Sequence, residues 1–462
     1  MSLQSLNPAT GETLETYPLT SPESIPSLVD RAHDAHRDYR RSSFTERGKY
    51  LRKLAELLGK NQRDHALLMT REMGKPVTQA MGEIEKCARA CEFYAEQAEK
   101  YLAIEHVETD ARESYVAFEP LGVILAIMPW NFPYWQVFRF AVPALMAGNA
   151  CLLKHASNVP GCSLALQQLF DEAGFPEDLF TSLLIKSRTV DEVIANDKVS
   201  AVTLTGSTAA GAAVAASAGK FLKKTVLELG GSDAYLILKD ADLELAARLC
   251  AQSRMQNAGQ SCIAAKRFVV DEAVLPQFEA LMVKAMAEYQ QGDPEDDNTN
   301  LGPLSRTDLR DDLHQQVAES VKRGARCLLG GEIPDGADDG NRGKGAYYPA
   351  TVLTQVDKSM PAWSEEMFGP VAVIIAARDE EDAINKANDS VFGLGAGVFS
   401  RDLERAKQIA TYELQAGSCV VNDFVKSDPR LPFGGIKQSG YGRELSYFGI
   451  REFVNIKSVV VG

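Results

Sequence analysis

The sequence predicts an α/β fold with two parallel-sheet units, and three observations support this fold class. Short apolar runs of strand length alternate with helical stretches along most of the chain, which is typical of parallel sheets with crossover helices. The composition, 45% hydrophobic and 24% charged, is that of an ordinary globular protein and excludes disordered and fibrous classes. A length of 462 residues exceeds what one hydrophobic core usually supports, so we expect two or three structural units.

The first half of the chain contains a helical region followed by a sheet. Residues 21–102 are predicted to be helical because apolar residues repeat at helical spacing with charged residues between them. Residues 107–118 alternate and predict an exposed strand. The short apolar runs that predict parallel strands are residues 123–127, 150–153, 199–204 and 225–227, with helices at residues 159–173 and 209–220.

A second set of strand and helix units follows Gly230. The predicted strands are residues 235–238, 268–270, 371–376 and 417–421, and the predicted helices are residues 243–255, 274–291 and 403–410. Residues 330–345 are rich in glycine and aspartate and predict a loop. The carboxyl-terminal residues 454–461 predict a strand that joins residues 107–118 in a small separate element.

The charge balance excludes two kinds of partner. Lysine and arginine total 49 against 63 aspartates and glutamates, which gives a net charge of −14. A surface this acidic repels phosphate backbones and anionic lipids, so we expect no nucleic acid and no membrane partner. The amino terminus lacks the basic and apolar regions of a signal peptide, and the most apolar window, residues 141–153, is too short to span a bilayer.

The cysteines and histidines predict neither a disulfide framework nor a metal site. Eight cysteines are scattered through a long chain, so we expect reduced thiols in a cytoplasmic compartment. His33 and His36 lie on a charged helix without a further ligand nearby, and Cys87 and Cys91 have the spacing of packing residues on one helix face.

Polar residues at the ends of the predicted strands are the candidates for chemistry, because ligands of open α/β sheets bind at the carboxyl ends of strands. Asn131 follows residues 123–127, and it is either a functional amide or a helix N-cap. Gly206 and Ser207 open a helix, where they are a cap, an anion site or both. Glu228 ends a strand and is a candidate base, whereas Cys262 is either a reactive thiol or a small buried hydrophobe.

Six motifs in order resemble the NAD(P)-dependent aldehyde dehydrogenase superfamily. They are PWNFP (129–133), TGS (205–207), LELGG (227–231), NAGQSC (257–262), EEMFGPV (365–371) and PFGGIKQSGYGRE (432–444). The resemblance implies a Rossmann-like cofactor domain, which in this family lacks the usual glycine fingerprint, together with an α/β catalytic domain and a small β oligomerisation element. The expected boundaries are 1–104 and 120–229 for the cofactor domain, 230–430 for the catalytic domain, and 105–119 and 431–462 for the oligomerisation element.

The same resemblance implies a covalent mechanism and a set of catalytic residues. Cys262 is expected to attack the aldehyde carbon, because a thiolate is intrinsically very nucleophilic. The side-chain amide of Asn131 and the backbone N–H of Cys262 are expected to hold the resulting oxyanion. Glu228 is expected to activate the water that hydrolyses the thioester left after hydride transfer to the cofactor.

Cofactor residues follow from the resemblance in the same way. Lys154 matches the lysine that contacts the adenosine ribose, Gly206 and Ser207 match the pyrophosphate site, and Glu366 matches the residue that holds the nicotinamide ribose. Trp130 and Phe368 are expected to line the cofactor pocket. Ser157 stands where many NAD-preferring members carry a glutamate, so the repulsion of a 2′-phosphate is absent and we expect NADP, as well as NAD, to be accepted.

The substrate prediction depends on Arg139. Succinate-semialdehyde dehydrogenases resemble this chain in having arginine eight residues after the oxyanion asparagine, and an arginine facing a tunnel needs an anion as its partner. The alternative for Arg139 is a surface salt bridge, which leaves a dehydrogenase of broad aliphatic or aromatic specificity. Gln256 stands where some such enzymes carry a second arginine, and Ser427 and Arg430 are either pocket or loop residues. The resemblance also implies a homodimer or homotetramer.

Overall fold

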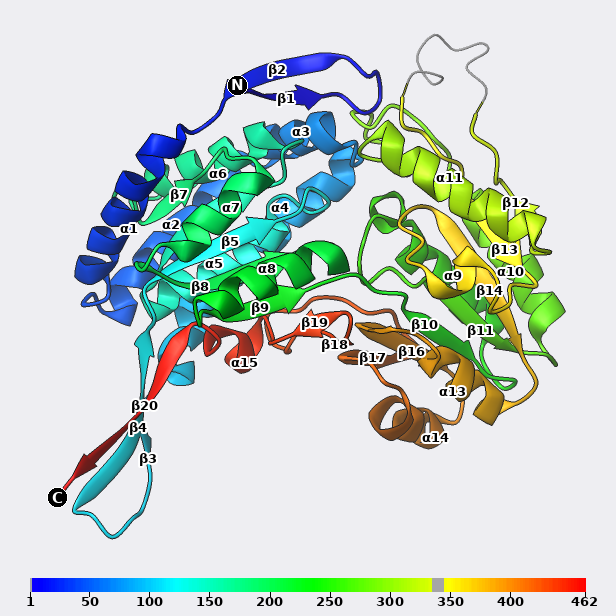
Figure 1. Ribbon diagram of the computed structural model, residues 1–462. Coiled ribbons are helices and arrows are strands. Elements are labelled where there is room, and N and C mark those ends of the chain that lie inside the picture. The colour runs from blue at the N-terminus through cyan, green and yellow to red at the C-terminus, as the bar shows by residue number, and fades with distance from the viewer. Residues whose placement is uncertain (1, 335–344) are drawn as a thin grey trace.

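A six-stranded and a seven-stranded sheet, each covered by helices, form the body of the protein in the computed structural model, which describes residues 2–334 and 345–462 (Figure 1). The predicted α/β fold class is therefore confirmed. The chain begins with an antiparallel hairpin that the sequence did not predict, made of β1 (Ser2–Leu6) and β2 (Thr13–Pro18).

The helical amino-terminal region is confirmed as one 3-10 turn and a run of helices. These are α1 (Ile25–Tyr39), α2 (Phe44–Lys60), α3 (Gln62–Met73) and α4 (Val77–Tyr101), after η1 (Pro22–Ser24). The helix α2 has a capping box, in which Ser43 and Glu46 satisfy each other's backbone N–H groups. The long helix α4 is important for the site because one of its faces lies against α5.

The first sheet has the strand order β19-β9-β8-β5-β6-β7 and is parallel except at its β19 edge. Its strands are β5 (Val123–Met128), β6 (Ala150–His155), β7 (Phe180–Ser182), β8 (Val199–Thr205), β9 (Lys224–Glu228) and β19 (Gly440–Tyr441). The crossover helices are α5 (Trp135–Ala147), α6 (Pro160–Glu172), α7 (Val190–Ala195), preceded by η2 (Ser187–Thr189), and α8 (Thr208–Lys220). Nearly every residue of β5 and β6 is buried, which explains their continuous apolar sequences.

The second sheet has the order β12-β13-β14-β11-β10-β16-β17, and only the β12–β13 pair is antiparallel. Its strands are β10 (Ala234–Ile237), β11 (Arg267–Asp271), β12 (Arg326–Leu329), β13 (Thr351–Thr354), β14 (Val371–Ala377), β16 (Gly395–Phe399) and β17 (Ser418–Val421). The helices around it are α9 (Leu243–Met255), α10 (Leu275–Ala287), α11 (Thr307–Lys322), α12 (Pro361–Ser364), α13 (Glu380–Asn388) and α14 (Leu403–Gln408), which continues as a π-helical turn (Ile409–Glu413).

A three-stranded sheet projects from the body, as Figure 1 shows at the lower left. The carboxyl-terminal strand β20 (Val454–Val461) pairs antiparallel with β4 (Glu113–Pro120), and β4 pairs with β3 (Glu105–His106). The predicted association of these two distant segments is confirmed, although the long strand begins at Glu113 rather than at Val107. The remaining elements are β15 (Phe392–Gly393), which pairs with β18 (Ile436–Lys437), and α15 (Ser446–Ile450).

The predicted strands are confirmed, but β7, β12, β13 and β16 were missed, as were the two-residue strands β15, β18 and β19. The strand β16 is glycine-rich, and a Cβ at Gly397 would lie 3.1 Å from the ring of Tyr235, so glycine here makes room for a neighbouring strand. Of the predicted loop 330–345, residues 335–344 lie outside the described residues. The division of the chain into domains stays a prediction.

Two further observations concern the part of the chain that the structure describes. None of its helices combines the length and hydropathy that crossing a bilayer requires. That part of the chain contains no group of three or more histidine, cysteine, aspartate or glutamate side chains placed to bind a metal ion.

Candidate active site

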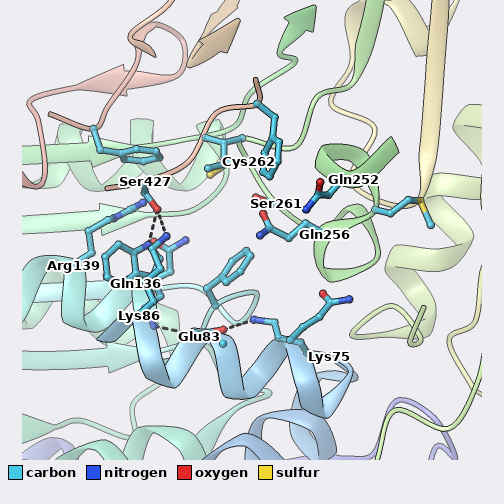
Figure 2. Close-up of a pocket in the computed structure, with 18 of the residues that line it drawn as sticks. Lys75, Glu83, Lys86, Gln136, Arg139, Gln252, Gln256, Ser261, Cys262 and Ser427 are labelled. Atoms are coloured by element: carbon cyan, nitrogen blue, oxygen red, sulfur yellow. Dashed lines mark hydrogen bonds and ion pairs between the residues drawn. The ribbon is translucent and has the colours of Figure 1, made fainter. Parts of the chain in front are cut away.

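Two cavities meet at Cys262. The larger, of about 470 Å³, lies among α4, α5, α9 and the 424–433 segment, and we call it the helical cavity (Figure 2). The smaller, of about 250 Å³, lies at the ends of β5, β8 and β9, and we call it the strand-end cavity. Cys262 and Gln136 line both cavities. The thiol is therefore accessible from two sides, one at the sheet edge and one among helices.

The turn before Cys262 has an unusual backbone. Asn257 and Ala258 adopt left-handed φ angles of 53° and 52°, and Gly259 follows with 75°. A Cβ at Gly259 would lie 2.1 Å from the carbonyl oxygen of Gly369, so only glycine fits there. Left-handed non-glycine residues cost free energy and persist where the surroundings impose them, which is common at functional sites.

Two side chains hold this turn and the residues that follow it. Lys266 donates from Nζ to the carbonyl oxygens of Ser261 (3.1 Å), Cys262 (2.9 Å) and Ala264 (3.2 Å). Gln79 of α4 accepts a hydrogen bond from the backbone N–H of Asn257 at 2.8 Å. Because these contacts come from both sides, the position of Cys262 is fixed by the fold rather than by a flexible loop.

The thiol of Cys262 is protonated in this state. Burial raises its pKa to about 12, and the positive charges of Arg139 and Lys266 only partly oppose that increase. The carboxylates of Glu366 and Glu228 raise the pKa further. A reactive thiolate therefore needs a proton acceptor or a change of environment when ligands bind.

Asn131 lies beside the same turn. Its side-chain Nδ2 donates to the carbonyl oxygen of Gln260 at 3.0 Å, and Asn257 donates to the carbonyl oxygen of Asn131 at 2.7 Å. The helix α5 begins after Tyr134 and is capped by Glu83, so the N-cap alternative for Asn131 is wrong. The second N–H of this amide is free to face a ligand at Cys262.

Glu228 lies just outside both cavities. It is 2% exposed, and within the described part of the chain neither carboxylate oxygen has a hydrogen-bond partner. Burial raises the pKa of Glu228, and the neighbouring carboxylate of Glu444 raises it further. Cys262 and Asn131 thus line the same strand-end cavity, whereas Glu228 lines neither cavity and lies in an environment that favours its protonated form.

The strand-end cavity contains most of the predicted cofactor residues. Trp130, Gly206, Ser207, Glu366 and Phe368 all line it. The rings of Trp130 and Phe368 meet edge to face with centroids 5.9 Å apart. Ser207 caps α8 by accepting from the N–H of Ala210 at 3.3 Å, which leaves the positive end of that helix directed at the cavity. The carboxylate can accept hydrogen bonds from the hydroxyls of a sugar, the two aromatic rings can pack against a flat ring, and the helix start can bind a phosphate.

Lys154 and Ser157 lie in a separate cavity of about 490 Å³ after β6. Lys154 is buried, and burial lowers the pKa of its ammonium group. Lys186 and Ser187 line the same cavity and were missed by sequence reasoning, because the short strand β7 that precedes them was not predicted. Two ammonium groups and two hydroxyls suit an anionic ligand such as a phosphate.

The predicted substrate residues Arg139, Gln256 and Ser427 all line the helical cavity. Arg139 is 2% exposed and forms an ion pair with buried Glu444, so the surface alternative is wrong. Its anionic partner belongs to the chain itself, which removes the argument that a substrate must supply it. Gln256 is exposed and makes no hydrogen bond among the described residues. Arg430 pairs with Asp428 at the surface.

Sequence reasoning missed the contribution of α4. Lys75 and Glu83 form a buried ion pair in the wall of the helical cavity, and Lys86 reaches Ser427, as Figure 2 shows. One signal was available: Glu83 falls on the same stripe of α4 as the buried Ala80, Ile84 and Cys87. A carboxylate on an apolar stripe needs a partner, which marks that helix face as unusual.

Comparisons with known proteins agree with this geometry. The profile of the aldehyde dehydrogenase family matches residues 1–459. The probable succinate-semialdehyde dehydrogenase [NADP(+)] of Synechocystis is 48% identical over 99% of both chains, and the succinate semialdehyde dehydrogenase [NAD(P)+] Sad of Escherichia coli is 46% identical over 98% of this chain and 97% of its own. A crystal structure of succinic semialdehyde dehydrogenase from Streptococcus pyogenes in complex with NADP+ superposes with a TM-score of 0.96, at 38% identity over 99% of both chains.

Proposed function

This chain belongs to the aldehyde dehydrogenase family, and we propose that it oxidises succinate semialdehyde to succinate with NADP or NAD. The observation that carries the proposal is the position of Cys262 between two cavities of different chemistry. The strand-end cavity offers a helix start and two rings to a nicotinamide dinucleotide, whereas the helical cavity offers cationic side chains to an acid-bearing aldehyde.

Cys262 gives up its proton to solvent, and the thiolate adds to the aldehyde carbon and forms a tetrahedral hemithioacetal whose oxygen carries the negative charge. Asn131 Nδ2 and the backbone N–H of Cys262 donate hydrogen bonds to this oxygen. Donors fixed in advance stabilise such an oxyanion without the cost of reorganising solvent. The strained turn at 257–259 holds the sulfur in place for this step.

The residues of the strand-end cavity fit a dinucleotide. Ser207 and the start of α8 would hold the pyrophosphate, Glu366 would accept from the hydroxyls of the nicotinamide ribose, and Trp130 and Phe368 would line the place of the ring. Bound there, the nicotinamide supplies the hydride acceptor that aldehyde oxidation requires.

Hydrolysis of the resulting thioester needs a water molecule and a base. Glu228 takes a proton from that water, which then attacks the thioester carbon and releases the acid and the free thiol. Because Glu228 lies outside both cavities in this state, its side chain rotates toward Cys262 for this step. Its raised pKa means that, once Glu228 has lost its own proton, its carboxylate is a stronger base toward water than an exposed carboxylate.

Ser157 and the two lysines of the cavity after β6, Lys154 and Lys186, support the use of NADP as the cofactor. Lys154, Ser157 and Lys186 would hold the adenosine ribose and its 2′-phosphate. The residues that line this cavity include two lysines and no carboxylate, so a 2′-phosphate would be attracted rather than repelled. NAD, which lacks this phosphate, would be held there by fewer contacts.

A second candidate is a dehydrogenase of broad aliphatic or aromatic specificity. The aromatic residues in the wall of the helical cavity favour it, namely Phe132, Trp135, Tyr289, Phe424 and Phe433. A panel of succinate semialdehyde, hexanal and benzaldehyde, each assayed with NADP and with NAD, separates the two functions. We expect the highest kcat/KM with succinate semialdehyde and NADP. A higher value with hexanal or benzaldehyde contradicts the proposed substrate.

We also propose that the chain acts in the cytoplasm as a homodimer or homotetramer assembled through its projecting sheet. The strand β20 is an edge of that sheet, and Ile456 and Val460 are 62% and 65% exposed. Exposed apolar edge strands are usually covered by another chain. Light scattering after size exclusion measures the assembly, and a monomeric mass contradicts this proposal.

A further inference from the structure

A half-buried ammonium group without a carboxylate partner lines the helical cavity. Lys86 of α4 donates from Nζ to Ser427 Oγ at 2.6 Å, and its Nζ lies 4.1 Å from the centre of the Trp135 ring. Within residues 2–334 and 345–462, no carboxylate forms an ion pair with it. Removing a cation from water without supplying an anion is unfavourable. The wall of the helical cavity therefore carries one positive charge, that of Lys86, which no carboxylate of the described residues neutralises.

The nearby carboxylates do not fill this role because each has another partner. Glu83 is held by Lys75 and accepts the N–H groups of Tyr134 and Trp135, both at 2.9 Å. The other pairs are Glu85 with Arg89, Asp428 with Arg430, and Glu444 with Arg139. Lys86 is thus a cation of the cavity wall that has no carboxylate partner in these pairs.

Ser427 adds a second donor beside this cation. Its Oγ accepts from Lys86 Nζ at 2.6 Å, as Figure 2 shows, and from Trp135 Nε1 at 2.9 Å. A hydroxyl oxygen has two lone pairs, so both are in use. The hydroxyl hydrogen remains, and it can only donate. Lys86 and Ser427 together therefore present N–H and O–H donors, which suit a ligand that only accepts.

We propose that Lys86, together with Ser427, binds the distal carboxylate of the substrate and is the residue that makes this enzyme specific for aldehydes with a terminal acid. The inference rests on the proposed function, because it uses the same cavity and the same substrate. Arg139 then contributes through its pairing with Glu444, which maintains the cavity wall, rather than as the first ligand of the carboxylate.

The surroundings of Lys86 make this binding sensitive to pH. Arg139 faces it from α5, Glu83, Cys87 and Arg89 from its own helix, and Asp428 from the loop after Ser427. Burial, and next the charge of Arg139, lowers the pKa of Lys86 to about 8. The ammonium form that binds a carboxylate is therefore present below pH 8 and is lost above it.

The test compares succinate semialdehyde with hexanal in three variants. Lys86→Met removes the charge at nearly constant volume, Lys86→Arg keeps a charge at all accessible pH values, and Lys100→Met removes a cation from the exposed last turn of the same helix. We expect Lys86→Met to lower kcat/KM for succinate semialdehyde by roughly ten- to a hundred-fold, mainly through KM, because a charged hydrogen bond is lost. Its activity on hexanal, and both activities of Lys100→Met, should stay within about twofold of wild type.

The pH profile gives a second readout that a purely structural role would not move. In the ratio of kcat/KM for succinate semialdehyde to that for hexanal, the pH dependence of groups that act in both reactions cancels. We expect this ratio to fall above pH 8 in the wild-type enzyme and to stay flat in Lys86→Arg. If Lys86→Met fails to fold, Ser427→Ala tests the same pair, and it should also lower the ratio.

The outcomes separate this inference from the proposed function. A wild-type preference for succinate semialdehyde that survives Lys86→Met, with an unchanged pH profile, overturns the role of Lys86 and leaves the proposed function intact. A wild-type enzyme that prefers hexanal overturns both.

Discussion

The two cavities that meet at Cys262 are built in different ways. The strand-end cavity is formed by residues that follow β5, β8 and β9, and its chemistry includes a helix start and small residues such as Gly206. The helical cavity is formed by long side chains from α4, α5 and α9, and it contains cations such as Lys75, Lys86 and Arg139. The first offers a ligand backbone groups as well as side chains, whereas the second offers mainly side chains, which can change without altering the fold. We infer that cofactor binding is a property of the sheet and substrate choice a property of the helices.

The largest expected effect comes from the residue that the cavities share. Cys262→Ala should lower dehydrogenase turnover by roughly 10⁴-fold or more, because the covalent step loses its nucleophile. Binding of NADP, followed by fluorescence titration, should remain. Cys327→Ala is the matched control, since this half-buried thiol lies on β12 and lines neither cavity. Retained turnover in Cys262→Ala contradicts the mechanism.

This difference in construction also explains what the sequence could predict. Asn131, Ser207 and Glu228 stand directly after apolar runs, so local pattern and motif identify them together. Most neighbours in the first sheet are consecutive strands, namely β5 with β6, β6 with β7 and β8 with β9, whereas the return of the chain from β7 to β8, beside β5, was not predicted.

The helical cavity could not be predicted in the same way. Lys86 meets Ser427 across 341 positions of sequence, and Arg139 meets Glu444 across the junction of α5 with the carboxyl-terminal segment. Such pairs depend on how helices pack, and no local pattern encodes that packing. The anion of Arg139 was therefore assigned to the substrate when the chain itself supplies it.

The next effect separates the two chemical steps at Cys262. Glu228→Gln cannot accept a proton from water, so steady turnover should fall by roughly 10²- to 10⁴-fold while a first-turnover burst of reduced cofactor remains. Rapid-mixing absorbance measurements of the reduced cofactor resolve the burst. If the burst disappears together with turnover, Glu228 acts earlier, in the ionisation of Cys262.

The same variant tests the environment of Glu228 through stability. Its pKa is raised in the folded protein, so the folded state holds the proton more tightly than the unfolded chain, whose glutamates ionise near pH ~4.3. Wild-type stability therefore declines as the pH rises from that value toward the raised pKa, while Glu228→Gln avoids this decline. Thermal unfolding at pH 5 and pH 8 should show a larger loss for wild type. An equal change in both proteins contradicts the raised pKa.

A smaller effect should be confined to the cofactor side. In Ser157→Glu the added carboxylate would face a 2′-phosphate, and a like charge about 4 Å away costs about 1–4 kcal/mol. We expect the ratio of kcat/KM for NADP to that for NAD to fall roughly tenfold or more. Ser157→Ala, which adds no charge, should change the ratio much less. The preference among aldehydes should not move, and a change there would contradict the separation of the two cavities.

The smallest effect is expected at Gln256, which lines the helical cavity but is exposed and makes no hydrogen bond among the described residues. Gln256→Ala should alter kcat/KM for succinate semialdehyde by less than about threefold, since surface changes away from buried networks usually cost little. Steady-state assays beside Lys86→Met give the comparison. If specificity depended on any polar residue in the wall, the two variants would behave alike. A large effect at Gln256 would mean that the carboxylate binds at the α9 side of the cavity, away from Lys86 and Ser427.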